Sequence, residues 1–241
     1  MRTGEIDGVR IVPLKLVRNE RGRLMEVHST LSVAAIQVRV NPWNRQSVLE
    51  ITDVISRGAH VVMLPMVRDW EQAAQFVDAV NGRARTSLLI ETAAALDGCD
   101  KLLSVDGIDE AHIGLNDLAI DLGREFIFDA LADRLLDRIA SVAAQRHIRF
   151  GFGAVAGRAC GSLPIDPEII ISEQARLGAS VAWLGRSYSR ASEKLSGSEL
   201  TNEIRWIRNR FQEPGDTEIS FRTLQKQLRF WKTSDALAVA S

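Results

Sequence analysis

The sequence predicts an α/β protein with a parallel sheet, and three features lead to that class. From residue 36 onward, short apolar runs bounded by Gly, Pro or Asn alternate with segments whose apolar residues recur every three or four positions. The runs are apolar at almost every position, as in strands buried on both faces. They recur about every 25 to 35 residues, which suits one strand–helix unit each. The runs predict strands at residues 36–40, 61–65, 87–91, 111–115, 149–153 and 181–185.

Helical periodicity connects and follows these strands. Residues 70–80 and 127–142 each carry one apolar face at helical spacing, which predicts helices that cover the sheet. Beyond the last strand, the pattern predicts a helix over residues 191–211, a break at 213–216, and a basic amphipathic helix over 221–231.

The N-terminal region departs from this pattern. Residues 9–17 and 22–28 predict the two strands of a β-hairpin around a turn, and no helix fits between them. We therefore expect three parts: an N-terminal hairpin extension (1–30), a barrel-like unit (31–190) and C-terminal helices (191–241).

Two architectures suit six strand–helix units. One is a TIM-type (β/α) barrel that lacks the first two units, and the other is an open doubly wound sheet. Periodicity does not choose between them, but the polar residues favour the barrel because barrel active sites are assembled from the carboxyl ends of different strands. The polar residues at or just after those ends are Asn41, Glu91, Asn116, Asp117 and Arg186.

The composition excludes several classes of protein. The 241 residues are 46% hydrophobic and 25% charged, with a formal net charge of -1, so the chain is neither disordered nor charged to attract nucleic acid. No apolar run reaches the roughly 20 residues of a membrane span, and residues 1–7 lack the apolar core of a signal peptide. Cys99 and Cys160 are too few for a disulfide framework or a zinc cage. We expect a cytoplasmic protein with no nucleic-acid or membrane partner.

Two acidic residues at neighbouring strand ends indicate a metal site. Glu91 ends the strand at 87–91, and Asn116-Asp117 follow the strand at 111–115. Carboxylates on one rim can share a divalent ion, and Mg²⁺ or Mn²⁺ is favoured because no Cys or His accompanies them. From the motif alone, two alternatives stay open: Glu91 caps the following helix, or it pairs with an arginine.

An arginine lies inside an otherwise apolar strand. Arg39 is flanked by Val38 and Val40, and a guanidinium inside a barrel is costly unless it meets an anion. Its planar fork suits a carboxylate or an enolate held beside a metal. The alternative is an arginine that faces solvent between helices.

Four motifs in register resemble one known family. They are Val38 to Pro42, Gly58 to Val67, Leu89 to Thr92 and Gly107 to Leu118. Together they resemble the HpcH/HpaI aldolase and citrate lyase beta-subunit family of phosphoenolpyruvate/pyruvate-type barrels, over about residues 33–190.

The resemblance implies a (β/α)₈ barrel that uses Mg²⁺ or a similar ion to make or break a carbon–carbon bond. Glu91 and Asp117 match the metal-binding carboxylates of the family. Arg39 matches the arginine that holds the substrate carboxylate and stabilises the enolate. Asn41 and Asn116, beside these positions, are further candidates for substrate binding.

A closer likeness joins the chain to a subgroup that we associate with surface-sugar and sialic-acid-type gene neighbourhoods. Its marks here are Gly114 to Leu118, Phe150 to Gly153 and Leu184 to Ser187. Arg186 and Ser187 thereby become candidates for substrate contact. The alternative is a helix start with Ser187 as its cap.

The sequence also departs from the family. Leu89 stands where the aldolase branch has a glutamine, and nothing before Arg39 matches the branch's general-base histidine. His28 is a poor replacement, and His112 could orient a metal ligand from behind. The first 25 or so residues instead look like the opening of a dTDP-4-dehydrorhamnose 3,5-epimerase, without any catalytic position.

Two functional hypotheses follow. The first is a metal-dependent carbon–carbon lyase, acting through an enolate on a 2-oxo acid or an acyl thioester as a homo-oligomer. The second is a degenerate barrel with weak catalysis that serves as a binding or assembly subunit, in a setting such as surface-polysaccharide metabolism. An epimerase is a distant third, since no full cupin sheet is predicted.

Overall fold

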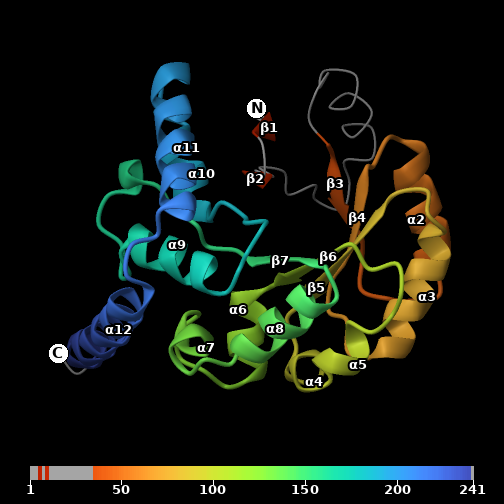
Figure 1. Ribbon diagram of the computed structural model, residues 1–241, viewed down its shortest axis with the longest axis horizontal. Helices are drawn as coiled ribbons and strands as arrows, with labels where there is room; N and C mark the ends of the chain where they lie inside the picture. The colour runs from red at the N-terminus through yellow and green to blue at the C-terminus, as the bar shows by residue number, and fades with distance from the viewer. Residues whose placement is uncertain (1–4, 7–8, 11–34, 240–241) are drawn as a thin grey trace.

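A parallel five-stranded sheet forms the centre of the molecule (Figure 1). The computed structural model describes residues 5–6, 9–10 and 35–239, and side chains from 35 to 233. The strands follow the order of the sequence across the sheet, as expected for successive strand–helix units. They are β3 (Gln37–Arg39), β4 (Val61–Leu64), β5 (Arg85–Ile90), β6 (Glu110–Ile113) and β7 (Arg149–Phe152).

The sixth predicted strand, at 181–185, is an extended segment and not a regular strand. It runs beside β7, where the Val181 N–H donates to the Phe150 carbonyl at 3.2 Å and Val155 pairs with Leu184 in one isolated parallel bridge. Gly151 explains the close approach, because a Cβ at that position would lie 1.7 Å from the Val181 carbonyl oxygen. The other five predicted strands are confirmed to within two residues at each end.

Helices follow the strands in alternation. Those between β3 and β7 are α2 (Ser47–Ser56), α3 (Trp70–Val80), α4 (Ala93–Asp97), α5 (Cys99–Leu102), α6 (Leu115–Asp121), α7 (Asp129–Ala132) and α8 (Asp137–Gln145). After β7 come a short 3₁₀ turn η1 (Arg158–Cys160), α9 (Pro167–Arg176), α10 (Arg186–Ser192), α11 (Gly197–Gln212) and α12 (Thr217–Val239).

Two predicted helices are each split in the structure. The segment 127–142 breaks between α7 and α8, where Arg134 adopts a left-handed φ of 56° that no helix interior accepts. The segment 191–211 breaks before α11, because Ser196 forms a capping box with Glu199 and starts a new helix there. The predicted break at 213–216 is confirmed, and the last predicted helix lies within α12.

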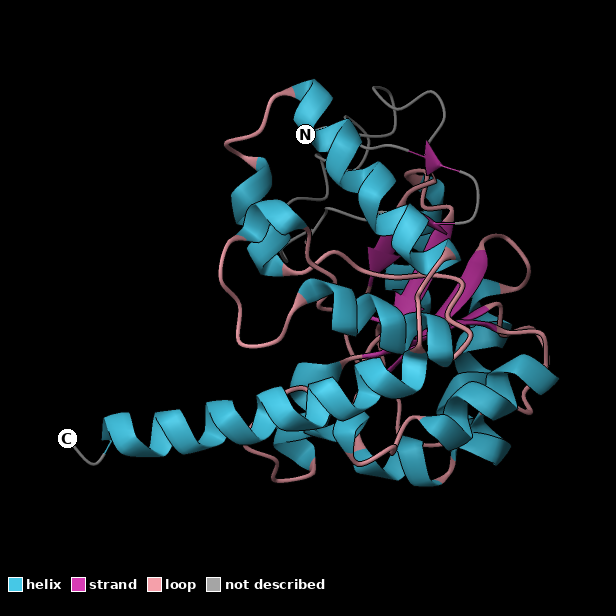
Figure 2. Cartoon of the chain, turned by 60° about the vertical axis from the view of Figure 1, so that its left-hand side comes forward, coloured by secondary structure: helices cyan, strands magenta, loops and turns pink. Residues whose placement is uncertain are grey.

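The main core lies between one face of the sheet and the helices α2, α3, α5 and α8 that cover it (Figure 1). Alternate strand residues such as Val38, Val62 and Leu88 point into this core, and we call this the outer face of the sheet. From the C-terminal region, α12 adds Phe221, Leu224 and Leu228 to the same core. The far end of α12 extends away from the body (Figure 2).

The predicted N-terminal hairpin lies only partly within the described residues. Glu5–Ile6 (β1) and Val9–Arg10 (β2) pair antiparallel, so the start of the predicted strand at 9–17 pairs with residues that precede it in the sequence. The rest of both predicted hairpin strands lies outside the described residues, as does His28. The division of the chain into three parts stays a prediction. Within the described ranges, no helix is long and apolar enough to cross a membrane.

Candidate metal and substrate site

The three residues proposed for metal and substrate chemistry lie along one edge of the sheet. Arg39 is the last residue of β3, Glu91 directly follows β5, and Asp117 lies in the first turn of α6 just after β6. The carboxyl ends of parallel strands share an edge, so these residues, distant in sequence, are brought to the same rim.

The Glu91 carboxylate is buried and held in a defined position. The residue is 3% exposed, and its Oε1 accepts a hydrogen bond of 2.9 Å from the backbone N–H of Met66, after β4. Met66 has a φ of 54°, an uncommon conformation for a side chain of its size, and its N–H serves the carboxylate. Thr92 caps α4 by accepting from the Ala95 N–H at 3.2 Å, so the helix-cap alternative for Glu91 does not apply.

Gly114 makes room for this carboxylate at the end of β6. A Cβ built on Gly114 would lie 2.5 Å from Glu91 Oε2 and 2.8 Å from the Glu91 Cβ. Contacts that short do not occur in real structures, so no other residue fits here without moving Glu91. Gly114 therefore contributes to the site by lacking a side chain.

The electrostatic surroundings raise the pKa of Glu91 from 4.5 to about 7. Burial is the largest cause, and the charge and hydrogen bond of Asp117 raise the pKa further. The Met66 N–H and the Arg39 guanidinium lower it, but they do not compensate. Asp117 therefore lies close enough to Glu91 to affect its ionisation, and the charge of Glu91 is not fully compensated by its surroundings.

Arg39 and Asn116 complete the group around the carboxylates. Arg39 is exposed, and its charge acts on Glu91 across the rim. Asn116 donates from Nδ2 to Asp117 Oδ1 at 3.1 Å, so it contacts the second carboxylate directly. The alternative of a solvent-facing arginine between helices does not fit, because Arg39 alternates with Val38 and Val40, which enter the main core.

Two other candidates lie farther from this centre. Asn41 donates from Nδ2 to Glu50 Oε1 at 2.7 Å, so its amide is held by α2. Arg186 is exposed at the start of α10, after the extended segment that runs beside β7. The N-cap of α10 is Gly185, so Ser187 is not the cap. A substrate role for Arg186 or Ser187 stays a prediction.

His112 does not orient either of the proposed metal ligands, because its ring faces Glu110 and not Glu91 or Asp117. Its Nε2 lies 3.7 Å from Glu110 Oε2, and its ring stacks on Trp183 with centroids 4.8 Å apart. Glu110 is 2% exposed and also meets Arg149 Nη1 at 2.9 Å and Arg85 Nη1 at 3.9 Å. These residues form a buried charge cluster at the opposite, amino-terminal end of the strands. The cluster joins β5, β6 and β7 away from Glu91.

The carboxylate pair fits a divalent ion. Within residues 35–233, no group of three or more His, Cys, Asp or Glu side chains could hold a metal, so an ion here would have two protein ligands. Mg²⁺ is commonly bound by one or two carboxylates, with water and substrate completing its shell. A positive ion would also remove the excess negative charge that raises the pKa of Glu91.

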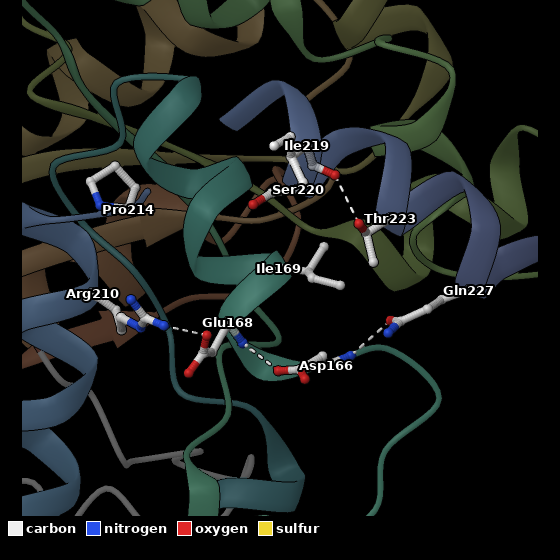
Figure 3. A pocket seen from close by; sticks show the side chains of 9 residues that line it. All are labelled: Asp166, Glu168, Ile169, Arg210, Pro214, Ile219, Ser220, Thr223 and Gln227. Atoms are coloured by element: carbon white, nitrogen blue, oxygen red, sulfur yellow. Dashed lines mark hydrogen bonds and ion pairs between the residues drawn. The ribbon is translucent and has the colours of Figure 1, made fainter. Parts of the chain in front are cut away.

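A separate hollow lies between α9, α11 and α12, with a volume of about 240 Å³ (Figure 3). Its polar groups are bonded to one another: Arg210 pairs with Glu168, and Gln227 Oε1 accepts from the Asp166 N–H at 3.1 Å. None of the rim residues lines it, so it is not part of the candidate site.

Sequence reasoning missed the Met66 N–H, Gly114 and Glu50. A backbone donor leaves no mark on the residue type, although Met66 directly follows the strand-ending Pro65. Gly114 had a usable signal, since a glycine at a strand end often marks close approach of another group. Glu50 had none, because nothing in the sequence of α2 distinguishes it from a solvated helix residue.

The fold and the site together define an α/β protein with a parallel sheet and two acidic residues at the carboxyl edge of that sheet. Residues 21–129 match the model of the family HpcH/HpaI aldolase/citrate lyase, which confirms the resemblance over that segment. The hydroxypyruvate/pyruvate aldolase of Rhizorhabdus wittichii is 30% identical over 151 residues, covering 50% of this chain and 59% of that protein. The chain thus spans little more than half the length of this relative.

Solved structures of the family share the fold. The HpcH/HpaI aldolase from Desulfitobacterium hafniense DCB-2 superposes with a TM-score of 0.61 and 16% identity, over 81% of this chain and 84% of its own. The citrate lyase beta subunit from M. tuberculosis, complexed with oxaloacetate and magnesium, superposes with a TM-score of 0.55 and 15% identity. The match covers 74% of this chain and 81% of that chain. The predicted fold class is confirmed, and closure of the sheet into a barrel stays a prediction.

Proposed function

We propose that the protein is a metal-dependent carbon–carbon lyase that acts on a 2-oxo acid or an acyl thioester through an enolate. One observation carries the proposal: Glu91, Asp117 and Arg39 lie at the carboxyl edge of the sheet, where Asp117 and Arg39 both act on the ionisation of Glu91. The relatives named aldolase and citrate lyase support the same class of reaction. We further propose, from the sequence resemblance, a cytoplasmic homo-oligomer.

The chain's own residues have distinct tasks in this proposal. Glu91 and Asp117 would hold Mg²⁺ or Mn²⁺, and Asn116 keeps Asp117 oriented by its 3.1 Å hydrogen bond. The ion, when bound, supplies Lewis acidity toward the 2-oxo group and the carboxylate of the substrate. Arg39 binds the substrate carboxylate through its fork and places positive charge where the enolate develops.

The simplest reaction that needs only these groups is decarboxylation of oxaloacetate. The bond between the carbon next to the oxo group and the departing carboxylate breaks, and carbon dioxide leaves. The electron pair stays on the remaining carbon as the enolate of pyruvate, which then takes a proton from water. Arg39 stabilises the enolate, and no side chain needs to remove a proton from the substrate.

A second candidate function is a binding subunit with little turnover, and the positions of the histidines favour it. His60 precedes β4, His147 precedes β7, and His112 bonds within the charge cluster. None of these three described histidines therefore follows the carboxyl end of a strand, where a base for aldol cleavage would act. Proton removal by such a base contributes about 10² to 10⁴ in rate, so we expect aldol cleavage to be slow.

Oxaloacetate decarboxylation with Mg²⁺ or Mn²⁺ distinguishes the two candidates. We expect a rate above that of the metal alone in buffer, reduced about 10²-fold in Arg39→Ala. Arg45→Ala is the matched control, because Arg45 is an exposed arginine a few residues later in the same loop. A rate equal to that of the free metal, with binding of a pyruvate analogue retained in calorimetry, would favour the binding subunit. Absence of both would refute the proposal.

A further inference from the structure

The carboxylate of Glu50, in the first turn of α2, binds the chain just beyond Arg39. Its two oxygens accept from the Asn41 backbone N–H at 3.3 and 3.2 Å, and Oε1 also accepts from Asn41 Nδ2 at 2.7 Å. One side chain of α2 therefore fixes both the backbone and the side chain of Asn41. We call this arrangement the Glu50 clamp.

The clamp lies at the end of β3, a strand with few partners among the described residues. β3 is three residues long and pairs with β4 alone among the described strands. The Val40 N–H extends that pairing by one bond to the Met63 carbonyl, at 3.0 Å. The next residue, Asn41, leaves the sheet, and the Glu50 clamp is what holds it.

The helix that supplies Glu50 is itself well anchored. Ile51, the next residue of α2, is fully buried in the main core. Ser47 is also fully buried, and its Oγ accepts from the Asn44 N–H at 2.8 Å, which fixes the loop from the other side. The position of Glu50 is thus set by packing, and the clamp transmits it to the strand end.

We propose that Glu50 is a positioning residue for Arg39, a role that rests on the proposed function of the site. Arg39 is exposed on a long, flexible side chain, so the direction of its first bonds depends on the backbone between Val38 and Asn41. Both carboxylate oxygens of Glu50 accept from Asn41, whereas a glutamine would keep one acceptor oxygen and turn an NH2 donor towards the donors of Asn41. The second carboxylate oxygen of Glu50 is therefore needed for the complete clamp.

Binding of Mg²⁺ and oxalate, measured by calorimetry, tests the proposal in Glu50→Gln. We expect about tenfold weaker oxalate binding to the Mg²⁺-loaded protein, with unchanged affinity for Mg²⁺ alone, because Glu91 follows β5 and Asp117 lies in α6, away from the Glu50 clamp. Glu71→Gln is the matched control: Glu71 is an exposed acidic residue in the first turn of the next helix, α3, and should change neither affinity.

A double-mutant cycle separates positioning from a direct contact between Glu50 and the ligand. If Glu50 acts through Arg39, Arg39→Ala combined with Glu50→Gln should bind oxalate no more weakly than Arg39→Ala alone. Losses that add in the double variant, or unchanged oxalate affinity in Glu50→Gln, would overturn the inference.

A ligand-free measurement keeps this inference separate from the proposed function. In nitrogen-15 NMR spectra, Glu50→Gln should lower the order of the Arg39 Nε–H group and speed hydrogen exchange at the Asn41 amide. If the wild-type protein binds no Mg²⁺ and oxalate, the proposed function fails, and the order of Arg39 alone decides. Faster exchange at Asn41 with unchanged order at Arg39 would show that Glu50 closes the loop without positioning the arginine.

Discussion

Replacement of Glu91 by glutamine should make the metal-free protein more stable while removing the proposed metal site. The pKa of Glu91 is raised from 4.5 to about 7, chiefly by burial. A folded-state pKa above the unfolded value means that folding favours the protonated carboxyl. Its contribution to stability is therefore present at acidic pH and is lost as the pH rises from 4.5 to about 7.

The size of this effect follows from the same pKa. A rise from 4.5 to about 7 corresponds to roughly 3 kcal/mol of destabilisation once the carboxyl is ionised. Glutamine has nearly the same shape, can accept from the Met66 N–H, and can donate to Asp117 without a charge. Allowing for relaxation around the ionised group, we expect Glu91→Gln to gain about 2 kcal/mol near pH 8. For a chain of this length that is about 4 to 8 °C in Tm.

Thermal melting with a chelator checks the expectation, at about pH 5 and about pH 8. The gain should be present at the higher pH and several-fold smaller at the lower one. Saturating Mg²⁺ should raise the Tm of the wild type and leave Glu91→Gln unchanged, because only the wild type binds the ion. If Glu91→Gln melts no higher than the wild type near pH 8 without metal, then burial does not destabilise the ionised carboxylate and our reasoning is wrong.

Two further outcomes are expected from neighbouring positions. Gly114→Ala should weaken Mg²⁺ binding at least about tenfold, because its Cβ would lie 2.5 Å from Glu91 Oε2, and calorimetry beside Gly153→Ala as control checks this. A Cβ at Gly153 meets Trp183 only at 3.9 Å, so equal losses in both variants would contradict the steric explanation. Glu110→Gln should cost about 3 kcal/mol in denaturant unfolding near neutral pH. Burial alone raises the pKa of Glu110, but His112, Arg149 and Arg85 bring it below its ordinary value of 4.5. The stability that ionised Glu110 contributes is therefore present above pH 4.5 and is lost as the pH falls through the lowered pKa.

The sheet could be predicted from the sequence because its strands are continuous apolar runs. β4 is buried at every position, and its predicted limits differ from the observed ones by a single residue. The segment at 181–185 has the same composition, yet it forms only one isolated bridge. Whether such a run completes a regular ladder depends on hydrogen bonds to its neighbour, and those are not encoded in its own pattern.

The helix boundaries show where local signals compete. The apolar face over 127–142 is continuous, but the left-handed turn at Arg134 divides it, and neither a Gly nor a Pro marks that turn. Before α11, by contrast, Ser196 and Glu199 form a capping box whose spacing is visible in the sequence. Attention to caps would therefore have separated α10 from α11, although it would not have separated α7 from α8.

The sequence was enough to predict that the charged residues of the candidate site lie on one rim. Glu91, Asp117 and Arg39 are polar groups at the ends of apolar strands, and parallel topology alone brings such ends to one rim. What holds each of them is not visible in that pattern: a backbone N–H for Glu91, an amide for Asp117, and a carboxylate on α2 beyond Arg39. Those supports come from segments that meet only after folding.

The two buried glutamates on β5 and β6 have opposite effects on stability, and this separates the two ends of the sheet. Glu110, among two arginines and a histidine, has its charge compensated, so the amino-terminal end of the strands is stabilised by it. Glu91 is equally enclosed, but the carboxylate of Asp117 affects it more strongly than the Arg39 guanidinium does, so burial leaves the Glu91 charge destabilising to the fold. If Glu91 had a structural role, we would expect positively charged side chains around it, as there are around Glu110. A buried carboxylate whose charge is not compensated, beside the exposed carboxylate of Asp117, is typical of a site that binds a cation, which is why we propose chemistry at this edge and a structural role at the other.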